Sequence, residues 1–264
     1  MTRSLRRVSV ALLALALAAI APAASAKQPS GCTSGTALVF FPNPVVTSGD
    51  TTLTDRKDRD YAALNDERVE VPLTGLDGSG YLRGTWATVR SATGDEAYET
   101  DCTYNYTRHD DRFEQVMAYY WVTKSQEYTR GLGFGVNAGW PAINGDAQRV
   151  RINQWGIDNS FATTHPKDEM RFGKGGVDDA EDAEVILHEL GHQIHFSASE
   201  TFFSTVEAGA SARASATTGP GPSSSGRSPR PACRPRPTRR ASRTGMRSRT
   251  RPARSTASAG STAT

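Results

Sequence analysis

Two histidines and a glutamate in the segment His188-Glu189-Leu190-Gly191-His192 have the types and spacing of a metal-dependent hydrolytic site. Because residues four apart share a helical face, His188 and His192 can direct both imidazoles at one Zn²⁺ ion. Glu189 is placed to act as the catalytic base, taking a proton from a metal-bound water whose pKa zinc lowers towards neutrality. The resulting hydroxide can attack a peptide carbonyl. The alternative is that the two histidines face solvent on an ordinary surface helix.

The residues around this segment predict the helix that such a site requires. Acids are frequent in residues 178–182, which is favourable at the positive, N-terminal end of a helix dipole. Apolar residues then recur at helical spacing, namely Val185, Ile186, Leu190 and Ile194. We therefore expect an amphipathic helix that buries this stripe and carries both histidines.

A second helix is expected further upstream. Asp111 followed by Glu114 has the spacing of a capping box. Apolar residues on one helical face follow, and Gly131 or Gly133 ends the run. This stripe predicts an ordinary core-facing helix.

Short β-like segments precede and follow that second helix. Residues 37–41, 68–73 and 81–89 are separated by turns rich in Gly, Asp and Pro, which predicts an antiparallel β region. Residues 149–153 alternate between polar and apolar side chains, as in a half-buried strand.

The charge of the chain divides it into three unlike segments. The net charge of +3 over 264 residues combines +3 in residues 1–26, −12 in residues 27–207 and +12 in residues 208–264. The bulk value therefore describes no single part of the molecule. Within the foldable segment we expect an α+β fold, in which an antiparallel β-rich part (residues 27–108) is followed by helices, including the histidine helix (residues 109–207).

Both ends of the chain lack the features of a packed domain. The N-terminus has a basic start, an apolar run over residues 8–20 and the small residues Ala24-Ser25-Ala26, which is typical of a signal peptide cleaved before Lys27. The alternative, a membrane anchor, would need a longer apolar run. The last 57 residues contain twelve arginines and no Val, Ile, Leu, Phe, Tyr or Trp, so we expect a disordered tail.

These ends also bear on location and partners. A signal peptide without a later apolar span predicts a secreted protein with no membrane partner. The basic tail offers charge for nucleic acid but no aromatic side chain to stack on bases, so we expect no nucleic-acid partner. Cys32 and Cys102 lie in the foldable part and Cys233 in the tail. Secretion allows a Cys32–Cys102 disulfide, although spacing alone leaves open two unpaired thiols.

The segment GGVDDA (residues 175–180) running into VILHELGH (residues 185–192) resembles the thermolysin/fungalysin-like (gluzincin) secreted zinc metallopeptidases, and most closely the fungalysin-type members exported by bacteria. The resemblance covers roughly residues 110–200. It implies an endopeptidase that acts on protein or peptide substrates with Zn²⁺ as its cofactor. In that family an Asn on an edge strand upstream of the metal helix binds the substrate backbone. Asn159, with Ser160 beside it, occupies the matching place here, and the alternative for Asn159 is a turn residue.

The chain departs from the family after the second histidine. The family's third zinc ligand is a Glu about twenty residues beyond that histidine, followed four residues later by an Asp that orients a ligand His. Here Glu200 and Glu207 both come too early, and no acid follows them. The third ligand is therefore not found in this chain, and we expect weak zinc binding and weak or absent activity. A second function class, a non-catalytic exported β-rich binding module with an incidental histidine pair, stays open.

A one-base slip of the reading frame near Ala210 accounts for the loss of every acid and every large apolar residue after Glu207. Residues 211–220 can be encoded so that reading from the third base gives Gly-Glu-Gly-Phe-Gly-Asp-Tyr-Trp-Ala. That stretch contains a Glu with an Asp four residues later, at the family's expected distance. The hypothesis is that the slip replaced the rest of a metallopeptidase domain with an Arg/Ser/Pro-rich tail.

Sequencing the gene across codon 210 tests this hypothesis. We expect that shifting the frame by one base restores a stretch with the family's Glu and Asp, followed by acids and apolar residues at globular frequencies. A shifted frame that encodes no such stretch would contradict the hypothesis.

Overall fold

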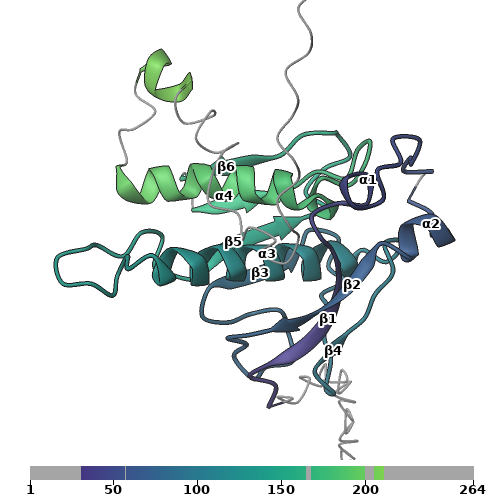
Figure 1. The fold of residues 1–264 in the computed structure, drawn as a ribbon, viewed down its shortest axis with the longest axis horizontal. Coiled ribbons are helices and arrows are strands. Elements are labelled where there is room, and N and C mark those ends of the chain that lie inside the picture. Colours follow the sequence, from purple (N-terminus) through teal and green to yellow (C-terminus); the bar gives the residue numbers. More distant parts are fainter. Residues whose placement is uncertain (1–30, 57, 165–167, 200–204, 211–264) are drawn as a thin grey trace, which may run out of the picture. The chain divides into compact units, whose positions relative to one another are not determined.

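The computed structural model describes residues 31–56, 58–164, 168–199 and 205–210, which belong to one unit of the chain. The expected signal peptide, Cys233 and all but three residues of the expected tail lie outside these residues. The described part is a mixed α+β fold with two β-sheets and two long helices, as Figure 1 shows.

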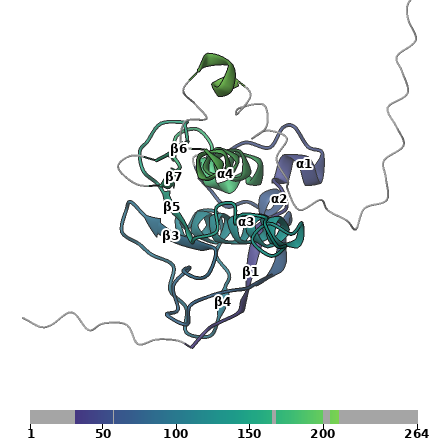
Figure 2. The same cartoon turned by 90° about the vertical axis from the view of Figure 1, so that its left-hand side faces the viewer.

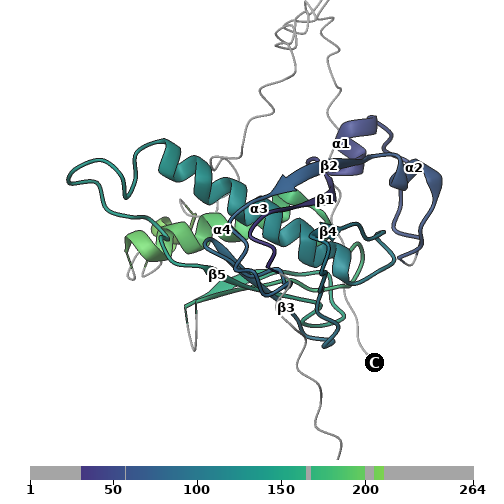
Figure 3. The same cartoon turned by 90° about the horizontal axis from the view of Figure 1, so that it is seen from below.

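The first sheet has the strand order β2-β1-β4. Strand β1 (Gly35–Phe40) pairs antiparallel with β2 (Arg68–Leu73) and parallel with the short β4 (Thr103–Tyr104). Two short helices, α1 (Pro44–Ser48) and α2 (Ala62–Asn65), lie at the end of the sheet where β1 ends and β2 begins (Figure 3).

A disulfide between Cys32 and Cys102 joins the starts of β1 and β4, with an S–S distance of 1.99 Å. Both cysteines immediately precede the strands, and Thr36 pairs with Thr103 in the parallel register. The expected pairing of these two cysteines is therefore confirmed.

The second sheet has the order β3-β5-β7-β6. Strands β3 (Ala87–Ser91), β5 (Gln148–Ile152) and β7 (Glu169–Arg171) run parallel, and β6 (Phe161–Thr163) is an antiparallel edge strand.

The expectation of an antiparallel β region therefore holds for β1 and β2 only. Strands β4 and β3, which fall within the same part of the sequence, form parallel pairs, and β3 pairs with β5 from beyond the long helix. Parallel neighbours require a crossover of a dozen or more residues, and helix α3 (Arg112–Gly131) lies in the connection between β3 and β5.

Helix α3 lies at the centre of the described fold and contacts β1, β3, β5 and the second long helix, α4 (Ala183–Ala198). Figure 2, which looks nearly along both helices, shows α4 lying beside α3. Fourteen of the twenty residues of α3 are buried, which is why its buried surface extends far beyond the apolar stripe seen in the sequence. The predicted helix is confirmed, and it ends at Gly131.

The predicted capping box at the start of α3 does not form. Asp111 has helical backbone angles and makes no capping hydrogen bond with its side chain. Asp110 instead accepts a hydrogen bond from the backbone N–H of Arg112 at 3.0 Å. The Glu114 side chain is fully buried, so it cannot reach back to a solvent-exposed helix end.

Helix α4 carries the histidine segment, as the acid-rich start and apolar stripe predicted. A short 3₁₀ helix, η1 (Asp179–Glu181), precedes it, and the Asp182 side chain caps it by accepting a hydrogen bond from the Glu184 N–H at 2.8 Å. Ile186 and Leu190 are buried against the core. None of the helices in the described residues is long and apolar enough to cross a membrane.

A buried charge cluster joins α3 to η1. Arg108, with 1% of its side chain exposed, donates from Nε to both carboxylate oxygens of Glu181 (2.9 and 3.0 Å) and from Nη2 to Asp55 (2.6 Å). Glu114 on α3 lies beside the Asp178 carboxyl group. Burial raises the pKa of Glu114 well above its ordinary value, and the adjacent Asp178 raises it further.

This arrangement predicts how stability responds to pH in EDTA. Because the pKa of Glu114 is higher in the folded than in the unfolded chain, its contribution is fully present below about pH 4.5 and is lost as the pH rises through the folded value. Glu114→Gln supplies a neutral amide that can donate to Asp178 at every pH. We expect this variant to melt several degrees above the wild type at pH 8 and to lose that advantage near pH 4.5.

Thermal melts at pH 4.5, 6 and 8 measure the difference. Glu70→Gln, on the exposed side of β2, is the matched control and should follow the wild-type profile. An identical pH profile for Glu114→Gln and the wild type would show that Glu114 does not titrate with a raised pKa.

Candidate metal-binding site on helix α4

The two histidines of α4 direct nitrogens into the same space. His188 Nε2 and His192 Nε2 lie 3.1 Å apart, and their rings stand at 89° with centroids 4.8 Å apart. Two nitrogens bound to one tetrahedral zinc at about 2.0–2.1 Å would lie about 3.3–3.4 Å from each other. The spacing of this pair therefore fits two positions of a zinc coordination sphere.

Glu189 lies between the histidines in sequence but turns into the interior, with 7% of the residue exposed. The backbone N–H of Ala162 on β6 donates a hydrogen bond to its carboxylate, whereas the buried Oε2 atom has no hydrogen-bond partner among the described residues. Burial raises the pKa of Glu189 to about 7; the Ala162 N–H lowers it, and Asp179 raises it slightly. A carboxyl group with that pKa can both accept and release a proton at neutral pH.

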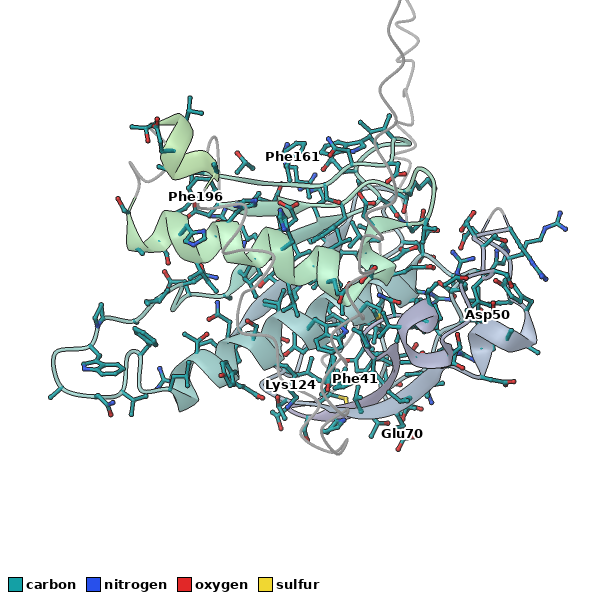
Figure 4. All side chains as sticks on the ribbon, turned by 45° about the horizontal axis from the view of Figure 1, so that its top comes forward. Phe41, Asp50, Glu70, Lys124, Phe161 and Phe196 are labelled. Atoms are coloured by element: carbon teal, nitrogen blue, oxygen red, sulfur yellow. A yellow bond between two sulfur atoms is a disulfide. The ribbon has the colours of Figure 1, made fainter. Side chains whose placement is uncertain are left out.

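The edge strand β6 runs along α4 and supplies the Ala162 contact. Figure 4 labels Phe161 on this strand and Phe196 near the end of the helix, which lets the reader follow both elements. The Phe161 ring stacks on Trp155 with centroids 4.7 Å apart and planes at 18°. Sequence reasoning did not find Ala162, because a backbone N–H leaves no signal in residue type.

Asn159 and Ser160 precede β6 and make no hydrogen bond to the histidine pair or to Glu189 in the described contacts. The Ser160 hydroxyl donates to the Asp179 carboxylate in η1, and so fastens the start of β6 to the start of α4. Asn159 is exposed, and its backbone carbonyl accepts from Trp155 Nε1 at 3.0 Å. The substrate-binding role of both residues stays a prediction.

No third protein ligand joins the histidine pair within residues 31–56, 58–164, 168–199 and 205–210. The cluster of metal-ligating side chains found there consists of Asp58, Asp178 and Glu181, away from the histidine segment. Glu207 is exposed, and Glu200 lies outside the described residues. The site therefore presents two ligands and a base, but an incomplete coordination sphere.

No protein-family model matches this chain, and no curated protein matches it either. The similarity to gluzincin metallopeptidases thus depends on the residues of the α4 segment alone and stays a prediction.

Zinc binding by the histidine pair is directly testable. A metal that binds the folded chain but not the unfolded chain raises the melting temperature. We expect saturating Zn²⁺ to raise the melting temperature of the wild type by a few degrees, and His188→Ala to abolish the shift. His109→Ala, which removes an exposed histidine far along the chain, should retain it. A shift that survives in His188→Ala would place the zinc elsewhere.

Proposed function

We propose that this chain derives from a secreted zinc-dependent endopeptidase of the thermolysin/fungalysin class. The observation that carries the proposal is the placement of His188 Nε2 and His192 Nε2 3.1 Å apart on a helix that also bears a buried glutamate. Secretion belongs to the proposal because a disulfide such as Cys32–Cys102 persists in oxidising compartments.

Each side chain has a distinct role in the proposed reaction. His188 and His192 would hold Zn²⁺, which when bound supplies Lewis-acid polarisation of a water molecule and of the substrate carbonyl. Glu189 takes a proton from the attacking water at Oε2, the oxygen without a protein partner. The Ala162 N–H holds the other part of the carboxylate, so that Oε2 keeps its orientation.

The edge position of β6 suits a peptide substrate. An extended peptide can add to an exposed sheet edge through backbone hydrogen bonds, which give affinity without demanding one sequence. Strand β6 ends its sheet and contacts α4, so a peptide bound there would pass close to Glu189. Proteins and peptides are therefore the proposed substrates.

The described ligand set limits the activity of this chain. Two histidines hold zinc more weakly than three ligands with a supporting hydrogen-bonded shell, and the water is then less well oriented. We expect purified protein to contain less than one zinc per chain and to hydrolyse casein weakly or not at all. Stoichiometric zinc with ready turnover would contradict the expected impairment.

Residual casein hydrolysis identifies the base. Glu189→Gln keeps the shape of the side chain and removes its ability to accept the proton, so any turnover should fall about 100-fold or more. Glu184→Gln, an exposed acid on the same helix, should keep the wild-type rate. Turnover that is unaffected by Glu189→Gln would contradict the proposed mechanism, and the absence of any zinc binding would favour the binding-module alternative.

A further inference from the structure

Three carboxylates from two segments of the chain meet on the side of α3 that faces η1. Asp58 comes from the loop before α2, Asp178 immediately precedes η1, and Glu181 ends it. One oxygen from each lies within 4.8 Å of the other two. Two oxygens on opposite sides of one Ca²⁺ ion, at about 2.4 Å each, are about 4.8 Å apart, whereas zinc or magnesium spans only about 4.2 Å.

Two buried oxygens in this cluster have no donor in the protein. Glu114 is fully buried, and its Oε1 atom has no hydrogen-bond partner, although its Oε2 accepts from Asn153 at 3.3 Å. The Glu114 carboxyl faces that of Asp178, and two carboxylates attract each other only through a shared proton or a cation. Asp58 Oδ1 is also shielded from solvent without a hydrogen-bond partner, and the nearest Arg108 nitrogen is 3.7 Å away.

The charges of the cluster do not balance. Arg108 is the buried cation, and it is committed to Glu181 and Asp55. His109 approaches Asp58 only at 3.9 Å and is 69% exposed. Isolated buried charges are costly, so the remaining carboxylates need either protons or a metal ion. One divalent cation supplies the missing positive charge in a single step.

A cavity of about 480 Å³ leads to this cluster. Asp178 and Glu181 line it, and its wall includes Val46 and Val177, which are 52% and 49% exposed, so the cavity opens to solvent. Further carboxylates on its wall are those of Asp55, Asp158, Asp179 and Asp182. A cavity lined by acids raises the local concentration of cations.

We propose that Asp58, Asp178 and Glu181 bind one Ca²⁺ ion, with the buried Glu114 carboxylate supporting Asp178 from behind. The ion joins the loop before α2 to the 3₁₀ helix that leads into α4. The site is separate from the histidine pair and independent of the proposed peptidase activity. Its effect is to hold the start of α4 in place.

Calcium binding is measured on the full chain after treatment with EDTA. Equilibrium dialysis against Ca²⁺ should give one ion per chain. Ca²⁺ at about 100 times its dissociation constant should raise the melting temperature by about 5–10 °C, and Mg²⁺ should raise it less. Asp178→Asn should abolish both binding and shift, and Asp58→Asn, at the more exposed end of the cluster, should weaken both if Asp178→Asn does not fold.

Two variants serve as controls for the calcium site. Asp158→Asn removes the same charge from the wall of the cavity and should retain the full shift, because Asp158 is outside the cluster. His188→Ala should also retain it, because the zinc ligands lie elsewhere on α4. Absence of Ca²⁺ binding by the wild type would overturn the proposal and leave a shared proton between Glu114 and Asp178. Binding that survives in both Asp178→Asn and Asp58→Asn would overturn it as well.

Discussion

The burial of α3 constrains the rest of the described fold. The helix contacts strands of both sheets and α4, so its polar side chains must find partners away from water. Gln115 accepts from the Ala97 N–H at 2.9 Å and donates to the Asp95 carbonyl at 2.7 Å, and Gln126 donates to the Asn144 carbonyl at 2.8 Å. These bonds fix loops that would otherwise be free, because an unmade bond inside the protein costs more than a made one contributes.

The candidate site inherits its geometry from this packing. Helix α4 lies against α3 on one side and against β6 and β7 on another, so the rotation of α4 about its axis is set by elements distant in sequence. That rotation decides that Glu189 is buried beside Ala162 while the histidines stay half exposed. Gln193, also on α4, donates to the Thr163 and Glu169 carbonyls at 3.3 and 3.2 Å and holds β6 and β7 to the helix.

Local patterns in the sequence predicted what depends on local geometry. The two long helices, the shared face of His188 and His192, and the Cys32–Cys102 pair all follow from spacing or from composition. Strand partners do not, because alternation reveals which face is buried but not which strand lies alongside; the parallel β3–β5–β7 arrangement was therefore missed. The acids before α4 were interpreted as a favourable helix start, whereas Asp178 and Glu181 turn inward, since Arg108 and Glu114 lie opposite them.

The disulfide has a consequence for a chain exposed to proteolysis. Cys32 and Cys102 are 70 residues apart, so they close a covalent ring that contains β1, β2, β3 and the loop carrying Asp58. A single backbone cut within that ring leaves both fragments bound to each other and to the rest of the protein. A nicked molecule therefore keeps its mass and most of its packing, and the damage becomes visible as separate fragments only after reduction.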